Sequence, residues 1–259
     1  MNALKIAATG MMAQQTNVDL LSNNISNLST TAFKRQRASF NDLVYQTKVA
    51  PGAVTSDTGT LSPTGAQIGL GVDVRATYKI FEQGAMSRTD APFDIGIQGR
   101  GLFQITMPDG TINYTRDGSF EVDNNGQLVT KQGYAVDPAI TIPADATNLT
   151  ITETGIVSAD VNNQIVELGQ ITVAMFINET GLSNQGGNLY KETPASGTAI
   201  ITNPSEDGSG KLLQFHIETS NVDPIESVTD LIAAQRAYEL NSRVISTADE
   251  MLSAVNQMR

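Results

Sequence analysis

The chain has 259 residues and a formal net charge of −11, from 16 lysines and arginines against 27 aspartates and glutamates. It has no cysteine and one histidine, which excludes disulfides, thiolate catalysis, zinc–sulfur sites and a metal site built from several histidines. The acidic balance argues against nucleic acid as a partner, because proteins that bind it present a basic surface. No stretch approaches about 18 consecutive apolar residues, so we expect no membrane insertion.

The N-terminal segment carries apolar residues at a spacing of seven, which predicts a long helix with a narrow apolar seam. The two interleaved sets are Leu4, Met11, Val18 and Ile25, and Ala7, Gln14, Leu21 and Leu28. A polar member of such a seam, here Gln14, fixes the register of the packing. No continuous apolar run follows Lys5, so this segment does not read as a cleaved secretory signal.

Two segments of different character follow the helix. The basic run Lys34-Arg35-Gln36-Arg37 is expected to pair with acidic residues of the body or of the C-terminal helix, with phosphate binding as the alternative. Residues 46–71 are rich in Gly and Pro and poor in large apolar residues. This composition is typical of a linker, a disordered loop or an arm that becomes ordered against a partner.

The middle of the chain changes to short alternating apolar runs separated by turn residues. Pro108-Asp109-Gly110, Asp117-Gly118 and Asn125-Gly126 predict successive β-hairpins, and residues 170–178 predict a buried strand. So many short strands favour an antiparallel barrel or sandwich. The predicted fold class is therefore α+β, with a β-rich middle domain between terminal helices.

The C-terminal segment repeats the heptad pattern of the N-terminal one. Its two sets are Leu231, Tyr238, Ile245 and Leu252, and Ala234, Asn241, Ala248 and Val255. Asp223 as a cap, Pro224 at the first position and Glu226 in a capping box predict the start of a helix of about 35 residues. Residues 1–50 have a net charge of +3 and residues 223–259 one of −3, which fits pairing of the two ends.

These helices have two interpretations. They are either two amphipathic helices of an ordinary core, or seam helices that pack as a coiled coil. The narrow seams and their placement at opposite chain ends favour the second, because such helices are marginal alone. The pattern leaves open whether the partner is the other end of the chain or another subunit.

No residue pattern in the sequence indicates a catalytic or ligand-binding site. His216 lies in an apparent strand with no nucleophile motif near it, and carboxylate pairs such as Asp90 and Asp94 are expected by chance in so acidic a chain. We therefore expect no enzymatic activity, no cofactor and no bound metal.

Four runs in order carry a resemblance to a known family. They are NNISNLSTTAFKR at 23–35, YTRDGSF at 114–120, GQLVTKQGY at 126–134 and QRAYELNSRVISTADEML at 235–252. Together they resemble the bacterial flagellar axial (rod and hook) proteins over nearly the whole chain. The runs at 59–72 and 81–103 resemble the distal-rod members most. Two departures affect local turns: the usual Gly before Phe33 is Ala32, and Asp223-Pro224-Ile225 replaces the usual run after Val222.

The resemblance implies a structural subunit of the distal rod. Subunits would polymerise helically through the terminal helices into a rigid, hollow drive shaft that transmits torque from motor to hook. The implied assembly interface consists of Leu4, Met11, Val18, Leu21, Ile25, Leu28, Leu231, Tyr238, Ile245, Leu252 and Val255. The implied stiffening arm between subunits includes Pro51, Gly59, Leu61, Pro63, Gly65, Ile68, Gly69 and Gly71.

The resemblance also implies partners, a location and a domain plan. The partners are other copies of the chain, proximal rod proteins and hook protein at the two ends, the P- and L-ring proteins, and the flagellar export apparatus. The location is the basal body, where the rod crosses the periplasm to the outer membrane. The expected parts are a helical domain (1–33 with 223–259), an extended linker region (34–80 with 211–222) and a β-rich outer domain (81–210).

Three other functions stay open at this point. The first is a proximal rod or hook protein of the same family. The second, from a different class, is an adhesin or binding module with an oligomerising stalk, which would form a closed bundle of fixed copy number. The third is a carboxylate-based hydrolase, which an activity screen would reveal.

Overall fold

The computed structural model describes residues 2–52, 64–162 and 164–257. The chain divides into two compact units. We name Met1–Ser26, Gln36–Lys79 and Asp223–Arg259 the terminal unit, and Asn27–Arg35 and Ile80–Val222 the central unit. The predicted α+β class is confirmed, because helices at both ends of the chain enclose a β-rich middle in the sequence.

The two long helices of the terminal unit are α1 (Asn2–Ser26) and α2 (Pro224–Gln257). Asp223 caps α2 as predicted, since its Oδ1 accepts hydrogen bonds from the backbone N–H groups of Ile225 at 2.8 Å and Glu226 at 3.1 Å. The 34 residues of α2 match the predicted length and span about 51 Å at 1.5 Å per residue. Because α1 ends at Ser26, the seam position predicted at Leu28 lies outside the helix, in the central unit.

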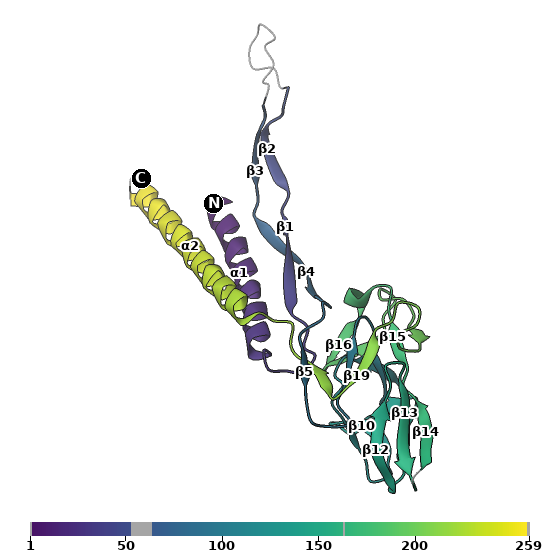
Figure 1. The fold of residues 1–259 in the computed structure, drawn as a ribbon. Coiled ribbons are helices and arrows are strands. Elements are labelled where there is room, and N and C mark those ends of the chain that lie inside the picture. Colours follow the sequence, from purple (N-terminus) through teal and green to yellow (C-terminus); the bar gives the residue numbers. More distant parts are fainter. Residues whose placement is uncertain (1, 53–63, 163, 258–259) are drawn as a thin grey trace. The chain divides into compact units, whose positions relative to one another are not determined.

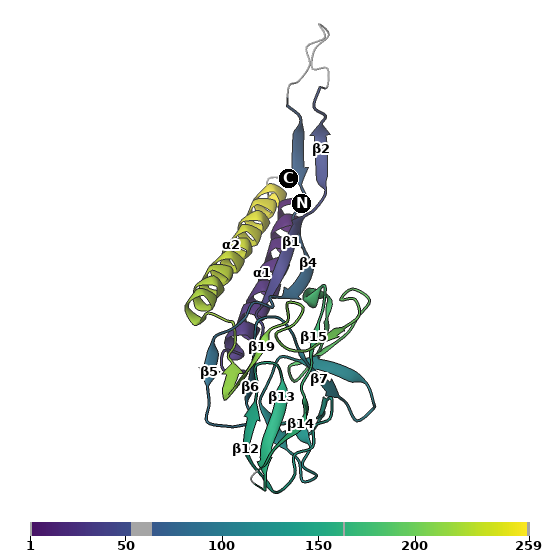
Figure 2. The same ribbon diagram turned by 45° about the vertical axis from the view of Figure 1, so that its right-hand side comes forward.

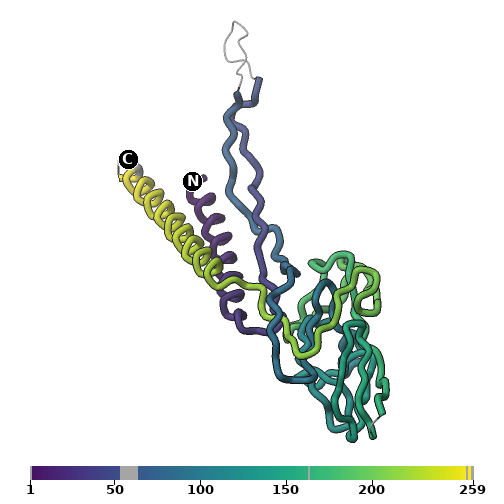
Figure 3. The backbone as a smooth tube through the Cα atoms, in the orientation of Figure 1, coloured from purple at the N-terminus to yellow at the C-terminus, as the bar shows by residue number. Residues whose placement is uncertain are grey.

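A two-stranded ribbon accompanies the helices in the terminal unit. β1 (Gln36–Asp42) pairs antiparallel with β4 (Val72–Lys79), and β2 (Tyr45–Val49) pairs with β3 (Ala66–Gly69). α1 contacts α2 and also both β1 and β4, and Figures 1 and 2 show α1 between α2 and this ribbon. The backbone tube shows β1 and β2 running alongside their partners β4 and β3 (Figure 3). The described part of 46–71 is therefore mainly paired strand.

Two polar side chains of α1 hold the ribbon. Asn24, which is 4% exposed, accepts a hydrogen bond from the Gln36 N–H at 2.8 Å and donates one to the Gln36 carbonyl at 2.9 Å. Thr9 Oγ1 lies against Gly71, where an added Cβ would come within 2.1 Å of it and where φ is +122°. Gly71 is thus required both by its backbone conformation and by the close approach of the helix.

The central unit contains short strands and one 3₁₀ turn, η1 (Glu179–Gly181). The strands are β5 (Met86–Arg88), β6 (Ile95–Gln98), β7 (Phe103–Thr106), β8 (Ile112–Thr115), β9 (Phe120–Val122), β10 (Leu128–Thr130), β11 (Ala135–Asp137), β12 (Ala146–Ile151), β13 (Ile156–Val161), β14 (Gln164–Gln170), β15 (Val173–Met175), β16 (Ser183–Gly186), β17 (Leu189–Lys191), β18 (Ile200–Thr202), β19 (Lys211–Gln214) and β20 (His216–Glu218).

The largest sheet of the central unit has the order β16-β17-β8-β7-β11-β10-β9. A second sheet has the order β12-β13-β14, and three strand pairs complete the unit: β6 with β19, β5 with β20, and β15 with β18. In the described residues β16 and β9 are open edges of the large sheet, so the barrel alternative of the prediction is wrong. The strands are too short and their connections too irregular to continue one sheet round to closure.

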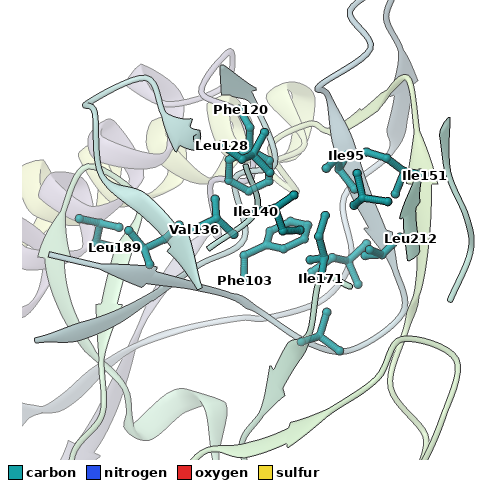
Figure 4. Packing of buried hydrophobic residues seen from close by; sticks show 14 residues of the cluster. Ile95, Phe103, Phe120, Leu128, Val136, Ile140, Ile151, Ile171, Leu189 and Leu212 are labelled. Carbon is teal, nitrogen blue, oxygen red and sulfur yellow. The ribbon is translucent and has the colours of Figure 1, made fainter. Parts of the chain in front are cut away.

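The core of the central unit consists of large side chains brought together from most of its strands. Figure 4 shows the principal cluster, in which Phe103 and Phe120 meet edge to face with ring centroids 5.1 Å apart. Ile95, Phe103, Ile105, Ile171 and Val173 are all 0% exposed. A second cluster joins Tyr114, Phe176 and Tyr190. The unit thus has the close-packed interior that lets a domain of this size fold by itself.

Two of the three predicted hairpin turns are present in the structure and one is not. Hairpins at Pro108-Asp109-Gly110 and Asn125-Gly126 are confirmed, between β7 and β8 and between β9 and β10. The hairpin at Asp117-Gly118 is wrong, because β8 pairs with β7 and β17 whereas β9 pairs with β10. This turn instead lies against β6, where the Ile95 N–H donates to the Gly118 carbonyl at 2.9 Å.

The expected buried strand at 170–178 is shorter than predicted. Only Val173–Met175 form β15, although Ile171 and Phe176 on either side are also buried. The three-part domain plan stays a prediction. In the described residues, no helix is long and apolar enough to cross a membrane.

Candidate functional site

The contact between α1 and α2 is made by small residues. Ala234 and Ala248 of α2 are 3% and 6% exposed, and Ala7 of α1 is 4% exposed. At Gly10 of α1 an added Cβ would lie only 3.0 Å from Nδ2 of Asn241. The helices therefore approach closely at Gly10 and Asn241, with no large side chain buried between them.

The larger residues of the predicted seams are only partly covered. Leu4, Met11, Val18, Leu21, Ile25, Leu231, Ile245 and Leu252 are half-buried. Tyr238 is 41% exposed. The side chain of Val255 lies outside the described part of the chain. In the terminal unit, the fully buried apolar residues are thus alanines, whereas the large apolar side chains keep part of their surface exposed to water.

α2 also carries large apolar residues that are exposed in the terminal unit. They are Ile225, Val228, Ile232, Leu240, Val244 and Met251, with exposures from 46% to 79%. At about 100° per residue these six residues spread over roughly 160° of the helix surface, mostly away from the buried Ala234, with charged residues such as Arg236 and Arg243 between them. We name these six residues the outer face of α2. These residues lie outside the predicted heptad seam of α2 and were not predicted.

The ribbon also exposes apolar residues. Val44 is 77% exposed, Tyr45 52%, Ile68 37% and Leu70 38%. Of the predicted arm, Gly59, Leu61 and Pro63 lie outside the described residues, whereas Pro51 is in an exposed turn and Gly65, Gly69 and Gly71 lie in or beside the paired strands. Gly65 leaves no space for a side chain, because a Cβ there would lie 2.6 Å from the Val49 carbonyl oxygen.

A buried ionic cluster joins distant segments of the central unit. Glu218 accepts hydrogen bonds from Lys34 Nζ at 2.6 Å, Arg116 Nε at 2.6 Å and the Gly84 N–H at 2.7 Å. The side chains of Lys34, Arg116 and Glu218 are 2%, 5% and 1% exposed. Lys34 also donates to the Glu82 carbonyl at 2.7 Å. The cluster thus fastens the segment 27–35 to β20 and to the loop before β5.

The charges of this cluster shift the pKa of two members. Burial alone would raise the pKa of Glu218, but the adjacent Arg116 and Lys34 outweigh burial and hold that pKa below its ordinary value. Burial lowers the pKa of Lys34, and the attraction of Glu218 offsets only part of this effect. Arg116 further donates to the carbonyls of Ile97 at 2.7 Å and Gly99 at 2.6 Å, so its donors are well satisfied.

The prediction that the basic run pairs with acidic residues is confirmed for two of its members. Lys34 pairs with Glu218, and Arg35 pairs with Glu82 at 3.1 Å. His216 is half-buried in β20, with Nδ1 2.7 Å from the Gln214 carbonyl oxygen. Across the described ranges, no group of three or more His, Cys, Asp or Glu residues is arranged to hold a metal ion.

Family models match three segments that together cover more than half of the chain. They are the flagella basal body rod protein (residues 4–34), the flagellar hook protein FlgE/F/G D1 domain (residues 96–159) and the flagellar basal body rod FlgEFG protein C-terminal (residues 213–258).

Several curated relatives match the chain end to end. The flagellar basal-body rod protein FlgG of Caulobacter vibrioides is 51% identical, with 100% of each chain covered. That of Borreliella burgdorferi is 49% identical over 100% of this chain and 99% of its own. That of Agrobacterium fabrum is 48% identical over 99% of both. Similarity of this degree over the full length shows that the chain belongs to the FlgG-type family of flagellar basal-body rod proteins.

Proposed function

We propose that the chain is a structural, non-catalytic subunit of the distal flagellar rod, which polymerises helically through its terminal unit. The observation that carries the proposal is the contrast between the two units. The central unit buries large aromatic and aliphatic side chains, whereas the terminal unit buries mainly alanines and leaves the outer face of α2 exposed. We take this contrast as support for association through the terminal unit, because helices that bury so little of their own surface need partners.

The proposed interface combines two faces of each helix pair. The half-buried seam residues would pack as a coiled coil, within the subunit and between neighbours, and the outer face of α2 would bury its apolar residues against the next copy. Helices with so little burial of their own gain most of their stability from such partners. A contact between two different faces builds an open helical tube when its rotation does not close a ring, and the proposal requires such a contact.

The ribbon would supply the stiffness of the tube. In this proposal, residues 46–71 reach a neighbouring subunit, where Val44, Tyr45 and Ile68 lose their exposed surface. Each strand of a two-stranded ribbon also keeps one unpaired edge, which can accept backbone hydrogen bonds from another chain. A tube whose subunits are joined through both helices and ribbons resists bending, as the transmission of torque requires.

The family resemblance supports the remaining parts of the proposal. Proximal rod proteins and hook protein would contact the two ends of the polymer, and the P- and L-ring proteins would surround it where the rod crosses the periplasm to the outer membrane. The chain would reach this place through the flagellar export apparatus.

The direct test places a charge on the outer face of α2. Leu240 is 61% exposed, so Leu240→Asp costs the monomer little but puts a carboxylate into the proposed interface. The matched control is Ile165→Asp, at an 82% exposed residue of β14. We expect Leu240→Asp to form no filaments by electron microscopy, whereas Ile165→Asp assembles. Filaments of normal length from the Leu240→Asp chain would contradict the proposal.

A second variant tests the seam itself. Ile245 is half-buried in α2, and Ile245→Asp should block polymerisation while leaving the central unit folded, because the two units have separate interiors.

Hydrogen exchange in the unassembled chain should be fast in α1 and α2 and slow in the core strands of the central unit. Equal protection of helices and core strands would favour a closed bundle, as in the adhesin alternative.

A further inference from the structure

Two residues that weaken a helix meet at the contact between α1 and α2. Gly10 is the only glycine in these two helices, and glycine inside a helix is less favourable than alanine because its backbone loses more freedom on folding. Asn241 stands near the middle of α2, and asparagine is also among the weaker helix formers. Such a residue inside a helix usually has a reason in packing or function. The place where these two residues meet indicates what that reason is.

The side-chain amide of Asn241 occupies the space that a side chain at position 10 would fill. A Cβ built on Gly10 would lie 3.0 Å from Nδ2, 3.3 Å from Cγ and 3.3 Å from Oδ1 of Asn241. These distances are short, since non-bonded carbon atoms pack best at about 3.5 to 4.0 Å. A residue larger than glycine at position 10 therefore has to displace the amide of Asn241.

The other small residues of α2 do not select one alignment of the two helices. Ser227, Ala234 and Ala248 are 8%, 3% and 6% exposed, and they recur at a spacing of seven in the same row as Asn241. Side chains this small have little shape by which one position differs from the next. A unique arrangement needs complementary shapes, and in this row the larger side chain of Asn241 against the bare backbone of Gly10 provides one.

A slip of α2 along α1 would break this fit. The smallest slip that brings another seam residue of α1 opposite Asn241 is one helical turn, about 5.4 Å. It would place Asn241 against Ala7 or Gln14, the seam positions on either side of Gly10. Both of these residues carry a Cβ in the space that the amide needs. The alignment seen in the structure is therefore the one that accommodates Asn241.

We propose that Gly10 and Asn241 select the register of the helix pair, with the amide of Asn241 seated against the backbone of Gly10 so that α2 is held at one axial position along α1. Both are positioning residues, because they determine which residues of the two helices stand side by side. The proposal concerns a contact within one chain. It goes beyond the rod-subunit function and does not depend on it.

The test measures the coupling between the two residues in the full-length, unassembled chain. Far-ultraviolet circular dichroism follows unfolding of the terminal unit, since α1 and α2 are the α-helices of the described residues. Trimethylamine N-oxide in the buffer brings a marginal transition into the measurable range, because this osmolyte strengthens burial. Urea unfolding then gives the equilibrium constant for helix pairing in each variant.

The sign of the Gly10→Ala effect decides the question. We expect Gly10→Ala to lower the equilibrium constant about threefold to tenfold while residue 241 is asparagine, because the added methyl group overfills the contact. In the Asn241→Ala chain, where the space is free, Gly10→Ala should raise that constant about fivefold, because alanine is the better helix former. A rise in both chains, or a fall in both, would overturn the proposal.

The control is Gln15→Ala, at an exposed residue of α1. It should change the equilibrium constant by the same factor whether residue 241 is asparagine or alanine. A Gln15→Ala effect that depends on residue 241 as strongly as the Gly10→Ala effect would show that the coupling is not specific to Gly10, and the proposal would be wrong.

Spin labels measure the alignment itself by pulsed electron paramagnetic resonance. The chain has no cysteine, so Ser22→Cys and Ala233→Cys, at exposed positions of α1 and α2, attach one label to each helix. We expect one narrow distance distribution, which Gly10→Ala broadens or splits by up to about 5.4 Å. Adding Asn241→Ala to Gly10→Ala should restore the single distribution. An unchanged distribution in Gly10→Ala, or no restoration by Asn241→Ala, would refute the register role.

Discussion

The cluster of Lys34, Arg116 and Glu218 gives a quantitative prediction for Glu218→Gln. The carboxylate accepts three hydrogen bonds of 2.6 to 2.7 Å, two of them from cations, at 1% exposure. The amide of glutamine carries no negative charge, so two buried cations are left without their counter-charge. Breaking a buried pair in this way costs about 3 to 5 kcal/mol. Domains are stable by only about 5 to 15 kcal/mol, so the central unit should lose much of its stability.

The assay is urea unfolding of the unassembled chain, followed by circular dichroism and by hydrogen exchange in the core strands. The matched control is Glu153→Gln, because Glu153 pairs with Lys211 at 3.2 Å in an exposed position. Loss of an exposed pair costs about 0 to 1 kcal/mol. If Glu218→Gln and Glu153→Gln shift the midpoint equally, the buried charge contributes no more than a surface charge, and the reasoning is wrong.

The same cluster predicts a pH dependence. The pKa of Glu218 lies below its ordinary value of 4.5 in the folded chain. As pH falls below about 4.5, the unfolded chain therefore takes up this proton first, and the stability that the carboxylate provides is lost as pH falls through the folded pKa. The wild-type chain should lose more stability than Glu218→Gln between neutral pH and about pH 3. Parallel losses in the two chains would show that other carboxylates control acid unfolding.

Three further predictions concern single features of the backbone and the ribbon. Ala32 is buried with φ +55°, so Ala32→Gly should change the free energy of unfolding by less than about 1 kcal/mol, because relief of backbone strain offsets the lost methyl group. The control Ala159→Gly, in β13, should cost about 1 to 2 kcal/mol. Equal losses for the two variants in urea unfolding would contradict the strain at Ala32. Gly71→Ala should destabilise the terminal unit by about 1 to 3 kcal/mol and speed hydrogen exchange in β4, whereas Gly52→Ala, with nothing within 4 Å of its Cβ, should cost less. Deletion of residues 50–66 should leave assembly intact but give a curved, more flexible tube by electron microscopy. A straight tube of equal stiffness would show that this segment does not stiffen the assembly.

The parts of the fold that depend on short-range pattern were predictable from the sequence. Asp223 and Pro224 predict the start of α2, because the cap forms between residues that are adjacent in the sequence. Asp109-Gly110 and Asn125-Gly126 predict hairpins, because glycine readily adopts the positive φ that tight turns require. Asp117-Gly118 carries the same signal but joins strands that pair elsewhere, and turn chemistry alone does not reveal strand pairing.

The missed features depend on contacts between distant residues. α1 ends at Ser26 although the heptad continues to Leu28, and Asn24 near its end binds the backbone of Gln36, which is 12 residues further along the chain. The pairing of β2 with β3 was not predicted, because the Gly and Pro residues of 46–71 indicate a linker and β2 lies exposed at every position, outside any core. The pairing of Lys34 with Glu218 could be anticipated only as a charge preference, since no local pattern selects one carboxylate among 27 acidic residues.

The position of Glu218 in the chain has a consequence for the order of folding. Its contact with Lys34 spans 184 residues and its contact with Arg116 spans 102. During synthesis from the N-terminus, Lys34 and Arg116 have no Glu218 to pair with until most of the chain has been made. In the same way, α1 cannot pack against α2 until the C-terminal residues are present. Contacts of such long range are slow to form and gain their free energy last. Both units therefore complete their folding only when the last part of the chain, from Glu218 onward, is free to pair.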